Sequence, residues 1–261
     1  MSNKILVLAE KPSVGKDIAR VLHCKNGGNG YLEGSQYVVT WALGHLVTLA
    51  DPEAYGDHYK TWNMESLPML PDPMKLVVIK SSGKQFSVVK KLLDRKDISD
   101  IIIATDAGRE GELVARWILD KAHCKKPVKR LWISSVTDKA IAEGFKNLKP
   151  GKAYENLYRA AKCRAEGDWI VGLNITRALT VKHNAQLSAG RVQSATLNMI
   201  VEREEIIKRF IPQPYFNIIA KTPQFSLTWQ GKQSKNISNE TTANELVKNY
   251  GIDIAINVSG N

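Results

Sequence analysis

Three carboxylates, those of Asp106, Glu110 and Glu112, follow one another closely in the stretch IIIATDAGREGELVARWILD, which covers positions 101–120. Carboxylates that share one crevice repel each other and raise each other's pKa unless a cation neutralises them. Mg²⁺ suits such a set, because it prefers oxygen ligands, keeps several waters and is completed by phosphate groups. The cluster therefore predicts a site for Mg²⁺ and a phosphodiester. For Glu110 and Glu112 there is a structural alternative, because acids in the first turn of a helix are stabilised by its dipole.

A second group of polar residues stands in the segment AEKPS. Glu10 ends an apolar run, Lys11 follows it, and Pro12 and Ser13 are residue types that open a helix. A carboxylate, an ammonium group and a helix N-terminus would meet here, which is an arrangement that holds phosphate well. The alternative is an ordinary strand-to-helix turn with an incidental lysine. The sequence contains no G-x-x-x-x-G-K-[ST] motif, so this common nucleotide-binding loop is excluded.

The elements that must position these acids alternate between strands and helices over residues 1–150. This βα rhythm predicts a parallel sheet with helices on both faces. The carboxyl ends of parallel strands lie at one edge of such a sheet. Glu10 and Asp106 both follow strands and are therefore expected to converge there. The strands are predicted at 4–10, 75–80, 100–106 and 130–135, and the helices at 13–23, 82–95, 112–122 and 137–148.

The rest of the chain divides by its sequence texture. Residues about 31–70 are too many for a simple connection and are predicted to form an excursion that packs elsewhere. Residues 151–211 are basic and helical, and the segment IPQPY ends this pattern. Residues 212–261 alternate like antiparallel strands, with a helix at 241–251 and a last strand at 252–261. This end is expected to be an incomplete β-rich domain, or alternatively a small complete α+β module.

Composition excludes several classes of protein. The chain has 261 residues, of which 43% are hydrophobic, and this allows a sizeable core. It has no signal-peptide pattern and no apolar run of about 18 residues, so a cytoplasmic protein without a membrane segment is expected. The cysteines (Cys24, Cys124 and Cys163) are too scattered for a disulfide framework or a C-x-x-C zinc site. A net charge of +11 favours nucleic acid as a partner ahead of membrane, although a generally solvated basic surface is the alternative.

Several longer motifs carry a resemblance to a known family. They are LAEKPSVGKDIA, GHLVTLADPEAY, ATDAGREGELVARWI, RLWISSVT, RAEGDWIVGLNITRAL and QLSAGRVQSATLNMIVERE. In this order they resemble the N-terminal half of the type IA DNA topoisomerases, and most of all the bacterial topoisomerase III group. The resemblance implies a Toprim fold in residues 1–150 with Mg²⁺ as cofactor, a helical groove for single-stranded DNA in residues 151–211, and the start of a β-rich gate-support domain.

Enzymes of this family cut one DNA strand through a tyrosine, pass another strand through the gap and reseal the first. The resemblance therefore implies an ATP-independent topoisomerase that acts on single-stranded and negatively supercoiled DNA. It also implies a monomeric protein with a helicase partner.

The resemblance assigns the chemistry to residues at the predicted edge of the sheet. Glu10 matches a glutamate that works in cleavage and religation, and Lys11 matches a lysine proposed to stabilise the scissile phosphate. Asp106 and Glu110 match the first and last acids of a D-x-D-x-E run, so Glu10, Asp106 and Glu110 are the implied Mg²⁺ ligands. Gly108 stands where the family has its second aspartate. The missing ligand is expected to be replaced by Glu112 or by water.

The helical segment supplies the implied DNA contacts. Arg164 and Asp168 are four residues apart, so the carboxylate can orient the guanidinium toward a phosphate, although an ordinary surface ion pair is the alternative. Gly190 allows close approach of a strand to the start of the helix that follows. His45, in the family's GHL motif, is expected beside the substrate, although histidines in such places more often only pack. The residues implied to contact DNA are Arg164, Asp168, Arg177, Arg191, Gln193, Ser194 and His45.

The tyrosine nucleophile of the family usually stands in a Y-x-R-T-[DE]-like run, and none of the eight tyrosines of this sequence has that context. The chain is therefore expected to be a truncated part of a topoisomerase and inactive by itself. The alternative is a shortened protein that only binds DNA or serves as a regulatory remnant. A Toprim nuclease or primase is a third possibility, and the helical motifs after residue 160 argue against it.

Overall fold

The structure of the chain, a computed structural model, describes residues 3–231, 236–250 and 254–258. The chain forms two units, residues 1–194 and 195–261, and each is described by itself. Within the described residues, no helix combines the length and the apolar character that crossing a membrane requires.

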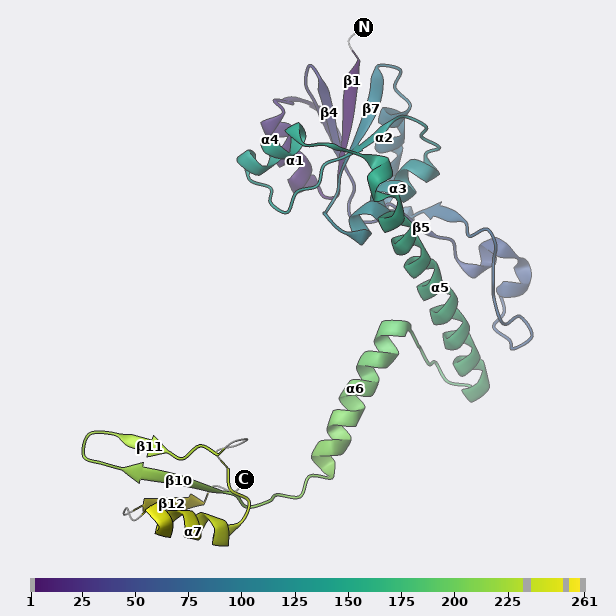
Figure 1. Ribbon diagram of the computed structural model, residues 1–261. Helices are drawn as coiled ribbons and strands as arrows, with labels where there is room; N and C mark the ends of the chain where they lie inside the picture. Colours follow the sequence, from purple (N-terminus) through teal and green to yellow (C-terminus); the bar gives the residue numbers. More distant parts are fainter. Residues whose placement is uncertain (1–2, 232–235, 251–253, 259–261) are drawn as a thin grey trace. The chain divides into compact units, whose positions relative to one another are not determined.

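A seven-stranded mixed sheet forms the centre of the first unit (Figure 1). The four strands in its middle, β4, β1, β7 and β8, run parallel, whereas β2, β3 and β9 are antiparallel to their neighbours. The strand order from edge to edge is β2 (Asn26–Gly28), β3 (Tyr31–Glu33), β4 (Tyr37–Trp41), β1 (Lys4–Ala9), β7 (Ile98–Ala104), β8 (Val128–Arg130) and β9 (Lys149–Pro150).

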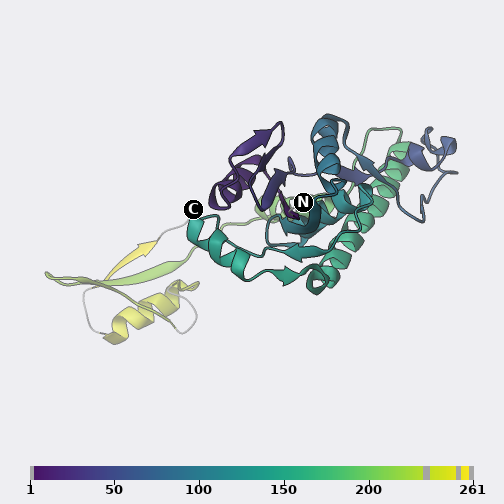
Figure 2. The same cartoon turned by 90° about the horizontal axis from the view of Figure 1, so that it is seen from above.

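Helices cover both faces of this sheet, as the βα rhythm predicts (Figures 1 and 2). Side chains of a strand alternate between the two faces. Val7 and Ala9 of β1 accordingly pack with α1 and α4, whereas Leu6 and Leu8 pack on the opposite face with α2, α3 and α5. The bounds of these helices are Pro12–Val21 for α1, Gly83–Leu93 for α2, Arg109–Lys121 for α3, Asp138–Lys146 for α4 and Glu155–His183 for α5.

Two expectations about the sheet are wrong. Residues 31–41, predicted as the start of an excursion, form β3 and β4 within the main sheet, and β4 lies directly beside β1. The strand predicted at 75–80 is present as β6 (Leu76–Val78), but it does not join the parallel sheet and instead pairs antiparallel with β5 (Val47–Leu49) in a separate two-stranded sheet. The excursion is thus confined to the residues after β4.

Helix α5 holds this shorter excursion in place. The Trp169 indole donates a hydrogen bond to the carbonyl of Ala50 (3.0 Å), and the Asn174 amide bonds both backbone groups of Met69. These contacts make residues 42–75 part of the same unit as the sheet. The short 3-10 helices of the unit are η1 (Pro52–Tyr55), η2 (Asp57–Tyr59), η3 (Lys80–Ser82) and η4 (Gly151–Tyr154).

The second unit begins within α6 (Arg191–Lys208) and contains a small antiparallel sheet. The strand order is β11 (Ser226–Thr228), β10 (Phe216–Lys221) and β12 (Ile254–Val258), and α7 (Glu240–Tyr250) packs against β10. Phe216, Ile218, Ile237 and Ala243 form its core. The predicted β-type alternation and the helix are confirmed. Part of the predicted last strand, at 252, 253 and 259–261, lies outside the described residues.

Candidate functional site

Glu10 and Asp106 meet at the carboxyl edge of the parallel sheet. Ala9 at the end of β1 pairs with Ala104 at the end of β7, so both acids leave the sheet at the same place. The backbone N–H of Asp106 donates a hydrogen bond to Glu10 Oε2 at 3.0 Å. Lys11 Nζ lies 3.7 Å from Asp106 Oδ2, and both side chains are more than half exposed. The expected convergence is therefore observed, with a cation beside it.

Tight packing of the turn between β7 and α3 fixes the position of Asp106. The Thr105 hydroxyl donates a hydrogen bond to the carbonyl of Gly111 (2.7 Å), which closes the turn. A Cβ atom at position 111 would lie only 2.0 Å from the carbonyl oxygen of Asp106. Only glycine fits there, so Gly111 is a further residue of the site. The sequence contains a signal for it, a glycine directly before the predicted helix at 112–122.

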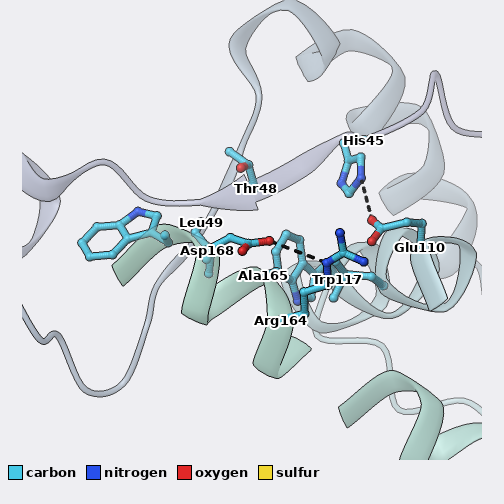
Figure 3. A pocket seen from close by; sticks show the side chains of 10 residues that line it. His45, Thr48, Leu49, Glu110, Trp117, Arg164, Ala165 and Asp168 are labelled. Carbon is cyan, nitrogen blue, oxygen red and sulfur yellow. Dashed lines mark ion pairs between the residues drawn. The ribbon is translucent and has the colours of Figure 1, made fainter. Parts of the chain in front are cut away.

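Glu110 lies on another side of this turn, toward His45 (Figure 3). His45 Nε2 is 3.8 Å from Glu110 Oε2, and the imidazole packs edge-on against Trp117. Within the described part of the chain, no three His, Cys, Asp or Glu side chains gather closely enough to hold a metal. The acids are thus divided into two groups, Glu10 with Asp106 and Glu110 with His45.

Glu112 does not replace the missing aspartate, so this alternative is wrong, whereas replacement by water stays a prediction. Its side chain is fully buried, with Oε1 2.6 Å from Arg130 Nε and Oε2 3.3 Å from Arg116 Nε. Residues two apart on a helix point about 200° away from each other. Glu110 therefore faces the crevice, while Glu112 faces the interior and pairs with arginines there.

An ion-pair cluster lies across a cavity from Glu110 and consists of Arg164, Asp168 and Arg191. Asp168 Oδ1 lies 2.8 Å from Arg191 Nη1, and Asp168 Oδ2 lies 3.7 Å from Arg164 Nε. A cavity of about 380 Å³ runs between this cluster and Glu110, lined also by Trp117 and other residues (Figure 3). The arginine side chains are almost half exposed, so their remaining N–H groups can reach an anionic ligand.

Two threonines of α5 position the start of α6. The Thr176 hydroxyl donates to the carbonyl of Ala189 (3.1 Å) and accepts from its N–H (3.0 Å). Thr180, one turn later, makes the same pair of bonds with Leu187. The segment before Arg191 is therefore held along α5 much as a strand is held by its neighbour, and this places Arg191 beside Asp168.

Gln193 and Ser194 are exposed at the start of α6, and their side chains bond to the same connecting segment. The Gln193 amide donates to the Ser188 hydroxyl (3.1 Å), and the Ser194 hydroxyl accepts from the N–H of Gly190 (3.2 Å). These bonds stabilise the turn that leads into the helix. A role of the two side chains toward DNA stays a prediction.

Arg177 is not available to DNA, contrary to the prediction. The residue is 2% exposed, its Nη1 donates to the carbonyl of Tyr59 (2.7 Å), and its guanidinium lies over the Trp62 ring. The helix turns this arginine toward the excursion and away from the cluster around Asp168. Its role in the structure is to hold the excursion against α5.

Comparison with known proteins gives two family matches. Residues 5–136 match the model of the Toprim domain, and residues 152–259 match a family described as DNA topoisomerase. The chain is 64% identical over 249 residues to DNA topoisomerase 3 of Bacillus subtilis (strain 168), a match that covers 95% of this chain and 34% of that protein. It is 67% identical to DNA topoisomerase 3 of Bacillus licheniformis, over 89% of this chain and 32% of that one.

A solved structure is also similar. Full-length topoisomerase I from Thermotoga maritima matches with a TM-score of 0.60 and 26% sequence identity, over 92% of this chain and 37% of that one. The chain therefore spans about a third of the length of the curated relatives that it matches.

Proposed function

The chain belongs to the type IA DNA topoisomerases and has a Toprim domain in residues 5–136. We propose that it supplies the phosphate site and part of the single-strand groove of an enzyme that cleaves, passes and religates DNA strands. The relatives are about three times as long, so strand passage is proposed for a protein of their full length. We propose that the tyrosine nucleophile lies in a part of the relatives that these 261 residues do not span.

One observation supports the proposal most strongly: the acidic edge, which we define as Glu10 and Asp106, lies next to His45, and His45 lines the same cavity as Arg164 and Asp168. The N–H of Gly44 lies 3.3 Å from the carbonyl oxygen of Glu10, so His45 stands next to the acidic edge. His45 in turn pairs with Glu110, and both line the cavity that Arg164 and Asp168 close. A DNA strand bound along this line would bring one phosphate to Lys11 while others meet the arginines.

Mg²⁺ fits the acidic edge by the type of its ligands. Mg²⁺ needs only one or two protein carboxylates when substrate phosphate completes its shell. Asp106 would hold it, together with the Glu10 oxygen that the Asp106 N–H leaves free. Glu110 would join only through a water or a movement away from His45. When bound, the ion neutralises charge that develops on the transferring phosphate, and Lys11 adds a positive charge beside Asp106.

Binding to single strands follows from the position of the basic side chains. Arg164 lines the cavity together with Trp117 and Trp169, and Arg191 pairs with Asp168 of the same lining. This arrangement offers contacts to phosphates rather than to paired base edges. We therefore propose that single-stranded DNA binds more tightly than duplex. Binding should weaken as salt rises, because each neutralised phosphate releases counterions.

Fluorescence anisotropy with a labelled oligonucleotide tests this groove. Arg191→Ala should weaken binding to all sequences alike and reduce the salt slope by about one. Arg20→Ala is the matched control, because it removes the same charge from α1 on the opposite face of the sheet. Equal affinity for duplex and single strands, or an equal effect of the two substitutions, would contradict the proposed groove.

A second experiment tests the proposed strand chemistry. Religation requires that the energy of the cut phosphodiester is kept in a covalent link to the protein. The 261-residue chain with Mg²⁺ should neither relax negatively supercoiled plasmid nor become covalently linked to an oligonucleotide, whereas the full-length Bacillus subtilis relative serves as the positive control. Relaxation by the highly purified short chain would place the nucleophile among its own tyrosines.

A monomeric state and a helicase partner are further proposals, which follow from the family resemblance alone.

A further inference from the structure

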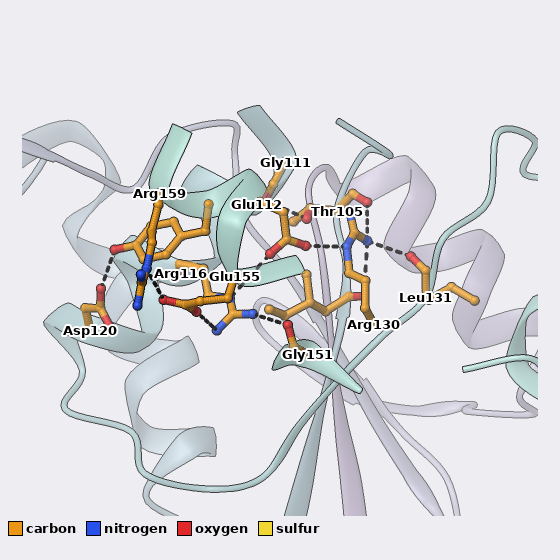
Figure 4. A network of polar contacts seen from close by, with 12 residues as sticks. Thr105, Gly111, Glu112, Arg116, Asp120, Arg130, Leu131, Gly151, Glu155 and Arg159 are labelled. Carbon is orange, nitrogen blue, oxygen red and sulfur yellow. Dashed lines mark hydrogen bonds and ion pairs between the residues drawn. The ribbon is translucent and has the colours of Figure 1, made fainter. Parts of the chain in front are cut away.

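A buried polar network surrounds Arg130 and Glu112 (Figure 4) and contacts the turn that carries Asp106. Its centre is the ion pair between Arg130, the last residue of β8, and Glu112 of α3, and both side chains are fully buried. Burial lowers the pKa of the Arg130 guanidinium, and the neighbouring Glu112 carboxylate opposes this effect. A buried charge is costly unless it is paired and hydrogen-bonded, so this pair requires an explanation.

Arg130 uses its remaining N–H groups on the turn that carries Asp106. Nη1 donates to the carbonyl of Thr105 (2.8 Å) and Nη2 donates to the carbonyl of Asp106 (2.7 Å). The same Nη1 also bonds the carbonyl of Leu131 (2.6 Å). A planar guanidinium can bond several fixed acceptors at once, whereas a lysine ammonium on a flexible stem cannot copy this geometry. The guanidinium thus fixes the two carbonyl groups that flank the Cα atom of Asp106.

The network continues from Glu112 to the start of α5. Arg116 pairs with Glu112 (3.3 Å), and its Nη2 donates to the carbonyl of Gly151 (2.7 Å). Arg116 Nη1 also lies 3.7 Å from Glu155, the first residue of α5. Helix α5 is the element that carries the cluster around Asp168. A continuous chain of ion pairs and hydrogen bonds therefore joins the acidic edge to the helix of the groove.

Aromatic rings cover the same arginine. The guanidinium of Arg130 lies 5.0 Å from the centre of the Trp132 ring, and Trp132 stacks on Tyr154 with ring centres 4.7 Å apart. Tyr154 directly precedes α5. The rings limit the access of water to the guanidinium, which strengthens its hydrogen bonds to the turn.

We propose that Arg130 is a positioning residue, which holds the Asp106 turn in the geometry that the phosphate and metal site needs and ties that turn to the start of α5. The inference rests on the proposed function, because it concerns the same site. Arg130 has no exposed surface and does not reach the crevice, so it acts through the backbone of Asp106.

Hydrogen exchange measured by mass spectrometry tests the positioning itself, without metal or DNA. Arg130→Lys keeps the positive charge and loses the planar fork, so amides in residues 104–111 should exchange about tenfold faster, while those in β1 stay protected. Glu112→Gln, a milder change that keeps the shape, should shift the same segment in the same direction. If Arg130→Lys does not fold, Glu112→Gln decides. Unchanged exchange in 104–111 in the folded variant would overturn the inference.

Mn²⁺ binding, followed by the electron paramagnetic resonance of the free ion, links the positioning to the site. Loss of a group that orients metal ligands typically costs about 10- to 100-fold in metal affinity. Arg130→Lys should therefore bind Mn²⁺ at least about tenfold more weakly. Arg116→Gln removes the links to Glu112, Gly151 and Glu155 but leaves the bonds from Arg130 to the turn in place, so it should keep a metal affinity close to that of the parent chain. A folded Arg130→Lys variant with parental Mn²⁺ affinity would leave the arginine a merely structural role and overturn the inference. Failure of the parent chain to bind Mn²⁺ would instead contradict the proposed metal site, and the exchange experiment would still decide the positioning.

Discussion

Replacing Gly111 by alanine should displace the Asp106 turn. The new Cβ would lie 2.0 Å from the Asp106 carbonyl oxygen, 2.9 Å from its carbonyl carbon and 3.0 Å from its nitrogen. All three are backbone atoms, so no flexible side chain can yield. Ordinary contact begins near 3.4 Å, and the carbonyl must therefore move by about 1.4 Å. This movement would take it out of hydrogen-bond range of Arg130, which is now 2.7 Å away.

The cost of this displacement follows from two effects. A lost hydrogen bond to a buried charged group costs about 1.5–3 kcal/mol, and overpacking costs about 1–3 kcal/mol. Alanine is the better helix former by up to about 1 kcal/mol, which offsets part of the loss. We expect the free energy of unfolding to fall by about 2–5 kcal/mol, which lowers the Tm of a unit of this size by roughly 5–15 °C.

Thermal unfolding followed by circular dichroism, with Mn²⁺ binding measured in parallel, checks this prediction. Gly83→Ala is the matched control, because no atom lies within 4 Å of its added Cβ and its backbone is already helical. The control should be neutral or more stable by up to about 1 kcal/mol. A Gly111→Ala variant with the Tm and the Mn²⁺ affinity of the parent chain would refute the argument from close packing.

Two further predictions concern other parts of the first unit. Hydrogen bonds from Arg95, and also from Lys4, lower the pKa of Glu33 from 4.5 to about 2. This carboxylate therefore stabilises the fold fully above pH 4.5, and its contribution is lost as the pH falls toward 2. After a discount for partial exposure, the stabilising contribution of the Glu33 carboxylate is about 1–2 kcal/mol. Urea unfolding of Glu33→Gln should therefore show a smaller loss of stability across this pH range. An unchanged pH profile would contradict the prediction. Thr176→Val removes two hydrogen bonds to Ala189 at nearly constant side-chain shape, so the segment before Arg191 should loosen. In anisotropy titrations, single-stranded DNA should then bind about three- to tenfold more weakly. An affinity equal to that of the parent chain would exclude this role for Thr176.

The position of the acidic edge could be predicted from the sequence because it depends on local patterns. An apolar run ends at Glu10 and another at Asp106, and parallel strands place their carboxyl ends together. Helical periodicity likewise identified the helices on both faces. The strand order was harder to predict, because β4 pairs with β1 although α1 and the β2–β3 hairpin separate the two strands in the sequence. Val38 and Val39 are both fully buried, so this short strand lacks the alternation that marks a half-buried strand.

The burial of charged side chains could not be predicted from the pattern. Nothing in the sequence marks Arg130 or Arg177 as buried, because arginines are almost never fully buried unless they are paired. Each is buried only because tertiary structure supplies acceptors that are distant in sequence, Glu112 for Arg130 and the carbonyl of Tyr59 for Arg177. The same applies to His45, whose pairing with Glu110 depends on the packing of the excursion against α3.

The most direct measurement of the central claim is metal-directed cleavage of bound DNA. Fe²⁺ in place of Mg²⁺, with ascorbate and peroxide, generates hydroxyl radicals at the metal site and cuts an end-labelled oligonucleotide nearby. If the acidic edge and the arginine cluster hold one strand, cleavage should be confined to a few adjoining nucleotides. It should disappear in Asp106→Asn, which still binds the strand, and should lose its sharp position in Arg191→Ala. Cleavage spread along the whole oligonucleotide, or a sharp pattern that survives in Asp106→Asn, would contradict the claim.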